Sequence, residues 1–169
     1  MTNFATYPNI GTQENLIDVF NEIAYNLNVN YLFGSIDEIV AQLETKKQAA
    51  VSRFPFVALV LPFTEQQGNG WDTSVNDFKF MIGCLIETPG KLFKDRYDAN
   101  YKGILYPIYT KFLAILAQSG YFREVYPEQI VHQKTDASNN DAGIPMPDYI
   151  DFVWIYNMKL NKIGKEPKL

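Results

Sequence analysis

Few side chains in this 169-residue chain are of the types that usually carry enzyme chemistry. His132 is the one histidine and Cys84 the one cysteine. A histidine can act as a general base, but no Ser, Cys or Asp stands at a spacing from His132 that is typical of a triad. Cys84 lies on the apolar face of an alternating segment, where a free cysteine behaves as a small hydrophobic residue. We therefore predict that this chain has no catalytic residue and is not an enzyme.

Carboxylates and tyrosines around a predicted long helix are the next candidates. Glu87, Asp95 and Asp98 could form an acid–base pair, but acidic residues are expected at a helix start because they oppose the helix dipole. Four tyrosines of this helix could line a ligand-binding site, but at helical spacing tyrosines are typical of a core or a subunit contact. They are Tyr97, Tyr101, Tyr106 and Tyr109.

Two segments resemble ligand loops and fail the pattern on inspection. The segment 136–143 has oxygen side chains at calcium-loop positions one, three and five, but position six is Asp141 in place of Gly and position twelve is Pro147 in place of Glu. Gly68-Asn-Gly70 lacks the Lys and Ser or Thr of a phosphate loop. One Cys and one His also exclude a disulfide framework and a closed zinc site. We predict no metal and no cofactor.

Composition favours a folded domain that does not read nucleic acid. The chain is 47% hydrophobic and 15% aromatic, which excludes global disorder. Its 15 Lys and Arg against 19 Asp and Glu give a net charge of -4, which disfavours binding through phosphate neutralisation. The length predicts one α+β domain over 1–169, with loose termini at 1–11 and 163–169. No secretory signal is visible and no apolar run approaches the roughly 20 residues that span a bilayer, so we expect synthesis in a cytoplasm and no membrane contact.

Apolar periodicity and capping residues predict three helices. Thr12 can cap a helix over about 13–28, and Ser35-Ile-Asp-Glu38 is a capping box for a second helix that frays through 45–50. A long pattern runs from Tyr97 to Ile115. Pro107 interrupts it, which predicts a kink near Gly103.

Alternation predicts four strands, at 53–63, 77–88, 128–135 and 148–162, with polar loops at 64–76 and 136–147. Tyr31–Gly34 is interpreted as a short extended piece. The first strand is apolar on both faces, so helices of its own chain or another subunit must cover it. In the last strand we assign Phe152, Trp154 and Met158 to one core face. The order is α-α-β-β-α-β-β, an antiparallel four-stranded sheet packed by helices, one of them long and kinked.

This order resembles that of a known family. The segments that carry the resemblance are Phe54-Pro-Phe-Val-Ala-Leu-Val-Leu61, residues 78–87, Ile104-Leu-Tyr-Pro-Ile-Tyr109 and residues 149–156, and together they resemble tailed-bacteriophage tail terminator, or tail completion, proteins. The resemblance implies a virion structural protein that forms a ring, usually a hexamer, which caps the tail tube and meets neck or head-completion proteins. It implies no catalytic residue.

Alternatives remain at this stage. The capped helix at 35–50 and the stretch 121–147 are longer than the resemblance leads us to expect, which leaves open a related neck or head–tail joining role in the virion. A third hypothesis is a small-molecule-binding module, or a small enzyme with a cleft beneath the long helix. A fourth hypothesis is a bacterial adaptor protein unrelated to phage.

The two polar loops and their flanks are the predicted contact surface for other copies, the tail tube and the neck. Loops of this length are often functional, and we expect the one with Trp71 to order only against a neighbour. The candidate contact residues are Trp71, Phe63, Asn69, Tyr121, Phe122, Asn139 and Asn140.

Overall fold

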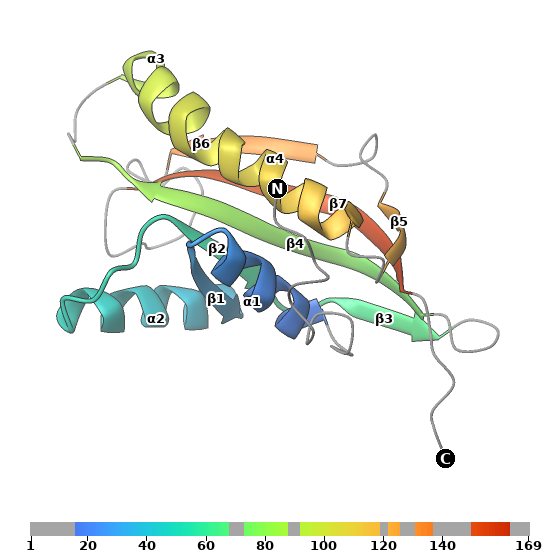
Figure 1. Ribbon diagram of the computed structural model, residues 1–169. Coiled ribbons are helices and arrows are strands. Elements are labelled where there is room, and N and C mark those ends of the chain that lie inside the picture. The colour runs from blue at the N-terminus through green and yellow to red at the C-terminus, as the bar shows by residue number, and fades with distance from the viewer. Residues whose placement is uncertain are drawn as a thin grey trace.

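The computed structural model describes residues 16–67, 73–87, 92–118, 122–125, 131–136 and 150–162. Its helices are α1 (Leu16–Asn26), α2 (Ile36–Gln48) and one long helix made of consecutive segments, α3 (Phe93–Arg96), η3 (Tyr97–Leu105) and α4 (Tyr106–Gln118). Its strands are β1 (Asn30–Gly34), β2 (Phe56–Val60), β3 (Thr64–Gln67), β4 (Thr73–Leu85), β5 (Phe122–Val125), β6 (Val131–Asp136) and β7 (Ile150–Lys162). The fold is α+β with a long kinked helix, as predicted (Figure 1).

The strands of the described residues form one mixed sheet, ordered β1-β2-β4-β7-β5, in which β3 also pairs with β4 and β6 with β7. The prediction of an antiparallel, four-stranded sheet was therefore wrong. The extended piece near Tyr31 is a strand, and it runs parallel to β2 because α2 forms the crossover between them. Part of the predicted polar loop at 64–76 is also sheet, since β3 pairs with the start of β4.

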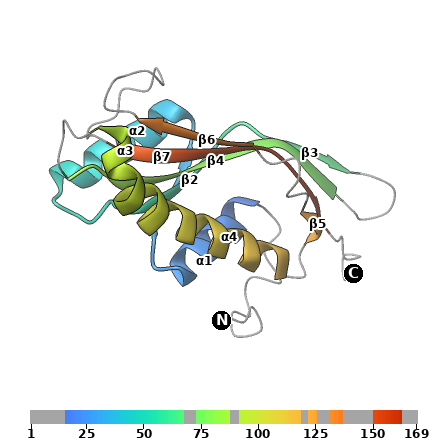
Figure 2. The same cartoon turned by 90° about the horizontal axis from the view of Figure 1, so that it is seen from above.

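Helices cover both faces of the sheet. Figure 2 shows α1 and the long helix on one side and α2 on the other. All five residues of β2 are buried. Val57 and Leu59 belong to the core under α1 and the long helix, which we call the helix-side core. Phe56, Ala58 and Val60 belong to the core under α2, the α2-side core. Of the two interpretations of this strand, coverage by its own chain is the correct one.

Two offset bulges change which face of the sheet the side chains of β4 and β7 occupy. The interval Val75–Phe78 on β4 holds one residue more than its partner interval, and Ile155–Met158 on β7 then holds one more than its own partner. Each extra residue moves the side chains that follow to the opposite face. Met158 therefore joins Ile155 in the helix-side core, and its predicted place on the face of Phe152 was wrong.

The predicted kink takes the form of a π-helical segment, η3. The last backbone bond of this segment runs from the Tyr106 N–H to the Tyr101 carbonyl, five residues back. Pro107 follows in the first turn of α4, where its missing N–H disturbs no established α-helical bond. A Cβ added at Gly103 would lie 3.1 Å from the Asp98 carbonyl oxygen, so the wide turn leaves little space for a side chain there.

The short helices end as their local sequence dictates. The Ser35 hydroxyl accepts from the Glu38 amide, and the Glu38 carboxylate accepts from the Ser35 amide, which confirms the predicted capping box. Asn28 follows α1 at φ 56 and Ala50 follows α2 at φ 53. The left-handed region suits Asn but is strained for Ala.

Candidate functional site

The structure describes two of the seven predicted contact residues, Phe63 and Phe122. Trp71, Asn69, Tyr121, Asn139 and Asn140 lie outside the described residues. Phe63 is half-buried and packs against the helix-side core of its own chain. Phe122 begins β5, and its backbone pairs with Lys162. The contact surface that these seven residues would form therefore stays a prediction.

The carboxylates at the start of the long helix are separate surface groups. Glu87, Asp95 and Asp98 are all exposed. The Asp98 carboxylate lies 3.9 Å from the Lys102 ammonium one turn on, an exposed pair of little energetic weight. This exposure fits the interpretation that the acidic residues oppose the helix dipole.

The tyrosines of the long helix belong to the core, as predicted. Tyr101 is fully buried in the helix-side core, and Tyr97, Tyr106 and Tyr109 pack against it. Burial raises the pKa of Tyr109 above its usual value. These side chains are half-buried or buried among apolar neighbours, so they stabilise the long helix on the sheet.

Cys84 lies in β4, in the middle of the sheet, and His132 lies in β6, which pairs with β7. Burial, with a smaller contribution from the Asp151 carboxylate, raises the pKa of Cys84 to about 12, so the thiol stays protonated at neutral pH. His132 lies in β6, where its backbone pairs with Ile155. Within the part of the chain that the structure describes, no three His, Cys, Asp or Glu side chains lie close enough together to hold a metal ion.

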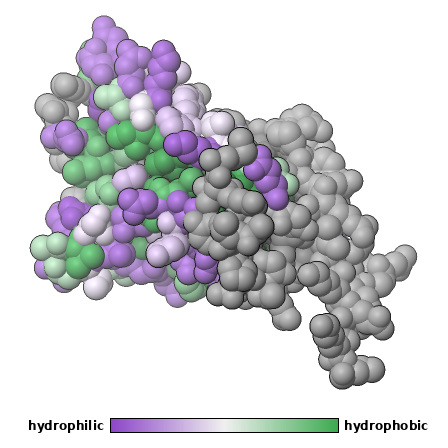
Figure 3. Space-filling view, in the orientation of Figure 1, coloured by the Kyte–Doolittle hydropathy of each residue, from purple (hydrophilic) through white to green (hydrophobic). Residues whose placement is uncertain are grey.

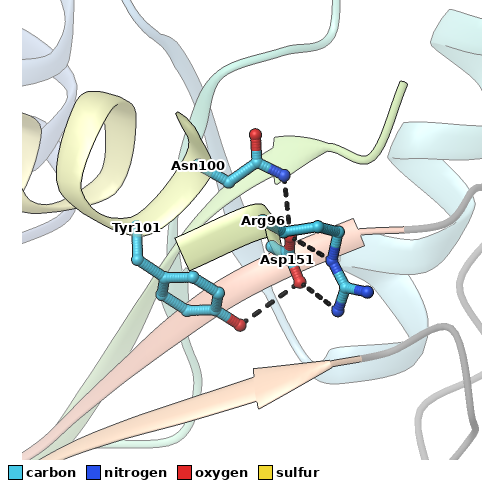
Figure 4. A network of polar contacts seen from close by, with 4 residues as sticks. All are labelled: Arg96, Asn100, Tyr101 and Asp151. Carbon is cyan, nitrogen blue, oxygen red and sulfur yellow. Dashed lines mark hydrogen bonds and ion pairs between the residues drawn. The ribbon is translucent and has the colours of Figure 1, made fainter. Parts of the chain in front are cut away.

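The polar cluster that the structure does reveal is centred on Asp151. Its two carboxylate oxygens accept from the Arg96 guanidinium, Nε at 2.9 Å and Nη2 at 3.0 Å. Asn100 Nδ2 donates at 2.7 Å and the Tyr101 hydroxyl at 3.3 Å to the same carboxylate (Figure 4). Asp151 is fully buried and Arg96 is 5% exposed. A carboxylate buried in this way needs both the opposite charge and the hydrogen bonds.

The π-helical geometry explains how one helix face supplies three donors. In an α-helix, residues five apart point in different directions, but in a π-helix the i to i+5 bonding places them above one another. Arg96 and Tyr101 are five apart, and Asn100 lies between them. Asp151 faces them because it is the second residue of β7, on the same side of the sheet as Val153 and Ile155.

The cluster was missed from the sequence, although a signal was present. By alternation Asp151 shares a face with Val153 and Ile155, but Asn157 and Lys159 follow on the same face, so the pattern alone indicates an exposed carboxylate. The signal is only that Asp151 stands directly beside two apolar positions, because a buried charge is rarely left unpaired. Asp151, Arg96 and Tyr101 are buried and Asn100 is half-buried, and all three donors bond to one carboxylate. The arrangement therefore holds the long helix on the sheet.

A second unusual feature is the edge of β1. Tyr31 and Phe33 stack there with ring centroids 5.9 Å apart. The Tyr31 hydroxyl donates to the Ile17 carbonyl at 2.8 Å, and burial is the main cause that raises its pKa. Phe33 is 44% exposed. We call these two side chains and the backbone of β1 the aromatic edge.

The chain matches no protein-family model, and no curated protein is significantly similar to it. Among the described helices, none is long and apolar enough to cross a membrane. Function must therefore be argued from the residues and their arrangement.

Proposed function

We propose that this chain is a non-enzymatic virion structural protein, a tail terminator whose copies form a ring, which is the hexamer that the family resemblance implies. The ring caps the tail tube, stops its growth and joins it to the neck or head-completion proteins. In this proposal the protein is made in the cytoplasm of a bacterial host and resides in the virion.

The observation that carries the proposal is the way four separated segments come together. The segments that resemble the tail terminator family contain β2, the second half of β4, the junction of η3 with α4, and the first half of β7. The three strands are neighbours in the sheet, and the long helix lies across them (Figure 1). Segments shared in order and joined into one structural unit support a common architecture more strongly than order alone.

The surface also supports an assembly role. Figure 3 shows an apolar band on this face, below α3 and the start of the long helix, with hydrophilic surface above and below it. Contiguous apolar surface of this kind is typical of protein contact sites.

The test is assembly with and without tail tubes. Light scattering after size exclusion, followed by negative-stain imaging, should reveal a cyclic oligomer, or a monomer that forms rings on the ends of purified tail tubes. Binding to neck assemblies but not to tube ends would support the alternative position in the neck. A monomer that ignores both refutes the proposal.

A further inference from the structure

The outward side of β1 has backbone groups with no strand to pair with among the described residues. On the β2 side, the Asn30 N–H donates to the Pro55 carbonyl at 3.0 Å, and the Gly34 carbonyl accepts from the Leu61 N–H at 2.8 Å. Successive residues of a strand direct their N–H and C=O groups to alternate sides, so those of Tyr31 and Phe33 point away from β2. Gln42 Nε2 reaches only the Phe33 carbonyl, at 2.8 Å.

Within the described residues, the sequence of β1 carries none of three common devices that block edge pairing. Natural sheets protect their edges with charged residues, proline or bulges, among other means. β1 reads Asn-Tyr-Leu-Phe-Gly and pairs with β2 without a register shift, so it has none of these three devices. Open amides beside an exposed aromatic ring are the features that strand addition uses, because the backbone supplies affinity and the side chains specificity.

At the opposite edge of the sheet, β6 lies at the same position along the strands as β1 and has a similar length. Phe33 pairs with Leu59, and the row continues through Phe80 and Ile155 to His132 in β6. The two edges therefore lie at the same height along the strands. β1 has five residues and β6 has six. One parallel step and three antiparallel steps separate them, so β6 runs opposite to β1.

We infer that β1 of one copy pairs with β6 of the next, so that the sheet continues from subunit to subunit. The inference rests on the proposed function, because a ring needs two different patches on each copy. If the next copy keeps the same strand sense, its β6 would add beside β1 as an antiparallel ladder, the more stable kind. Because both edges lie at one level of the strand register, the two strands can pair without a slip along the ladder.

Paired cysteines at positions 33 and 132 test this contact. Within one chain these positions are four strand spacings apart, roughly 19 Å at about 4.8 Å each, whereas a disulfide needs Cα atoms within about 7 Å. A bond between them must therefore join two copies. Mild oxidation of the Phe33→Cys, His132→Cys protein should give a ladder of covalent oligomers on a non-reducing gel, and reduction should collapse it. Cys84 can stay, because it is buried.

Matched variants separate this contact from random collision. Tyr25→Cys with His132→Cys has a more exposed thiol, since Tyr25 on α1 is 76% exposed against 44% for Phe33, and should still give no ladder. Phe33→Pro removes an outward N–H but keeps the bonds to β2, so it should abolish oligomers while the circular dichroism spectrum stays unchanged. A 33/132 pair that gives no more covalent oligomer than the Tyr25 control overturns the inference.

The outcomes also distinguish this inference from the proposed function. A ring that caps tubes but does not cross-link through 33 and 132 keeps the function and loses the edge contact. Protein that cross-links into a ladder yet never binds a tube or a neck keeps the edge contact and loses the function.

Discussion

Removing the Asp151 carboxylate tests directly what holds the long helix on the sheet. In Asp151→Ala the Arg96 guanidinium, 5% exposed, keeps its charge but loses the two oxygens at 2.9 and 3.0 Å. Breaking one side of a buried ion pair typically costs about 3–5 kcal/mol. In a domain of this size each kcal/mol lowers the melting temperature by roughly 2–4 °C. We expect a loss of about 6–20 °C.

A double-mutant cycle isolates the pair from the rest of the site. Arg96→Met combined with Asp151→Ala leaves neither charge of the pair, so the double variant should lose far less stability than the sum of the two single changes. Asn100 and Tyr101 still lose their acceptor in the double variant, at about 1 kcal/mol each. Urea unfolding followed by tryptophan fluorescence and circular dichroism measures all four proteins.

The reasoning fails if the single losses simply add, or if Asp151→Ala unfolds at the wild-type urea concentration. Asp98→Ala is the matched control, because it removes an exposed carboxylate from the long helix that carries Arg96. Its ion pair with Lys102 is exposed and 3.9 Å long, so the melting temperature should barely change.

Three further changes test other features of the fold and the assembly. Gly83→Ala should destabilise by about 1–3 kcal/mol in urea unfolding, because a Cβ would lie 2.5 Å from the buried Phe56 ring; an unchanged midpoint would contradict this. Ala50→Gly should stabilise by about 0.5–1 kcal/mol by relieving φ 53, whereas Ala49→Gly, at φ -77, should gain nothing. Trp71→Ala should leave the melting temperature unchanged and weaken binding to tail tubes, so a large melting loss would count against a contact role.

The sequence predicted the elements that local chemistry determines. The capping box at Ser35 locates the start of α2, and Pro107 places the irregular turn of the long helix near Gly103. Both features depend on residues within a few positions of one another, which is why pattern reasoning finds them.

Pairing partners could not be predicted in the same way, because they depend on distant residues. β1 is only five residues long and becomes a strand through β2, with α2 as the crossover. The bulges in β4 and β7 hide the alternation that would have placed Met158 in the helix-side core. Trp154, predicted as core, is only half-buried, and the Lys79 ammonium lies 5.6 Å from its ring centroid.

Coverage of β2 by the chain's own helices changes where an assembly contact must be sought. An apolar strand with one open face would have bound a neighbour through that face, but α1 and α2 already bury both sides of β2. The sheet's edges are different, since the backbone of the aromatic edge and that of β6 each pair on one side only among the described residues. If copies of this chain form a ring, hydrogen bonds between edges, with Phe33 beside them, can supply both the direction and the specificity of the contact.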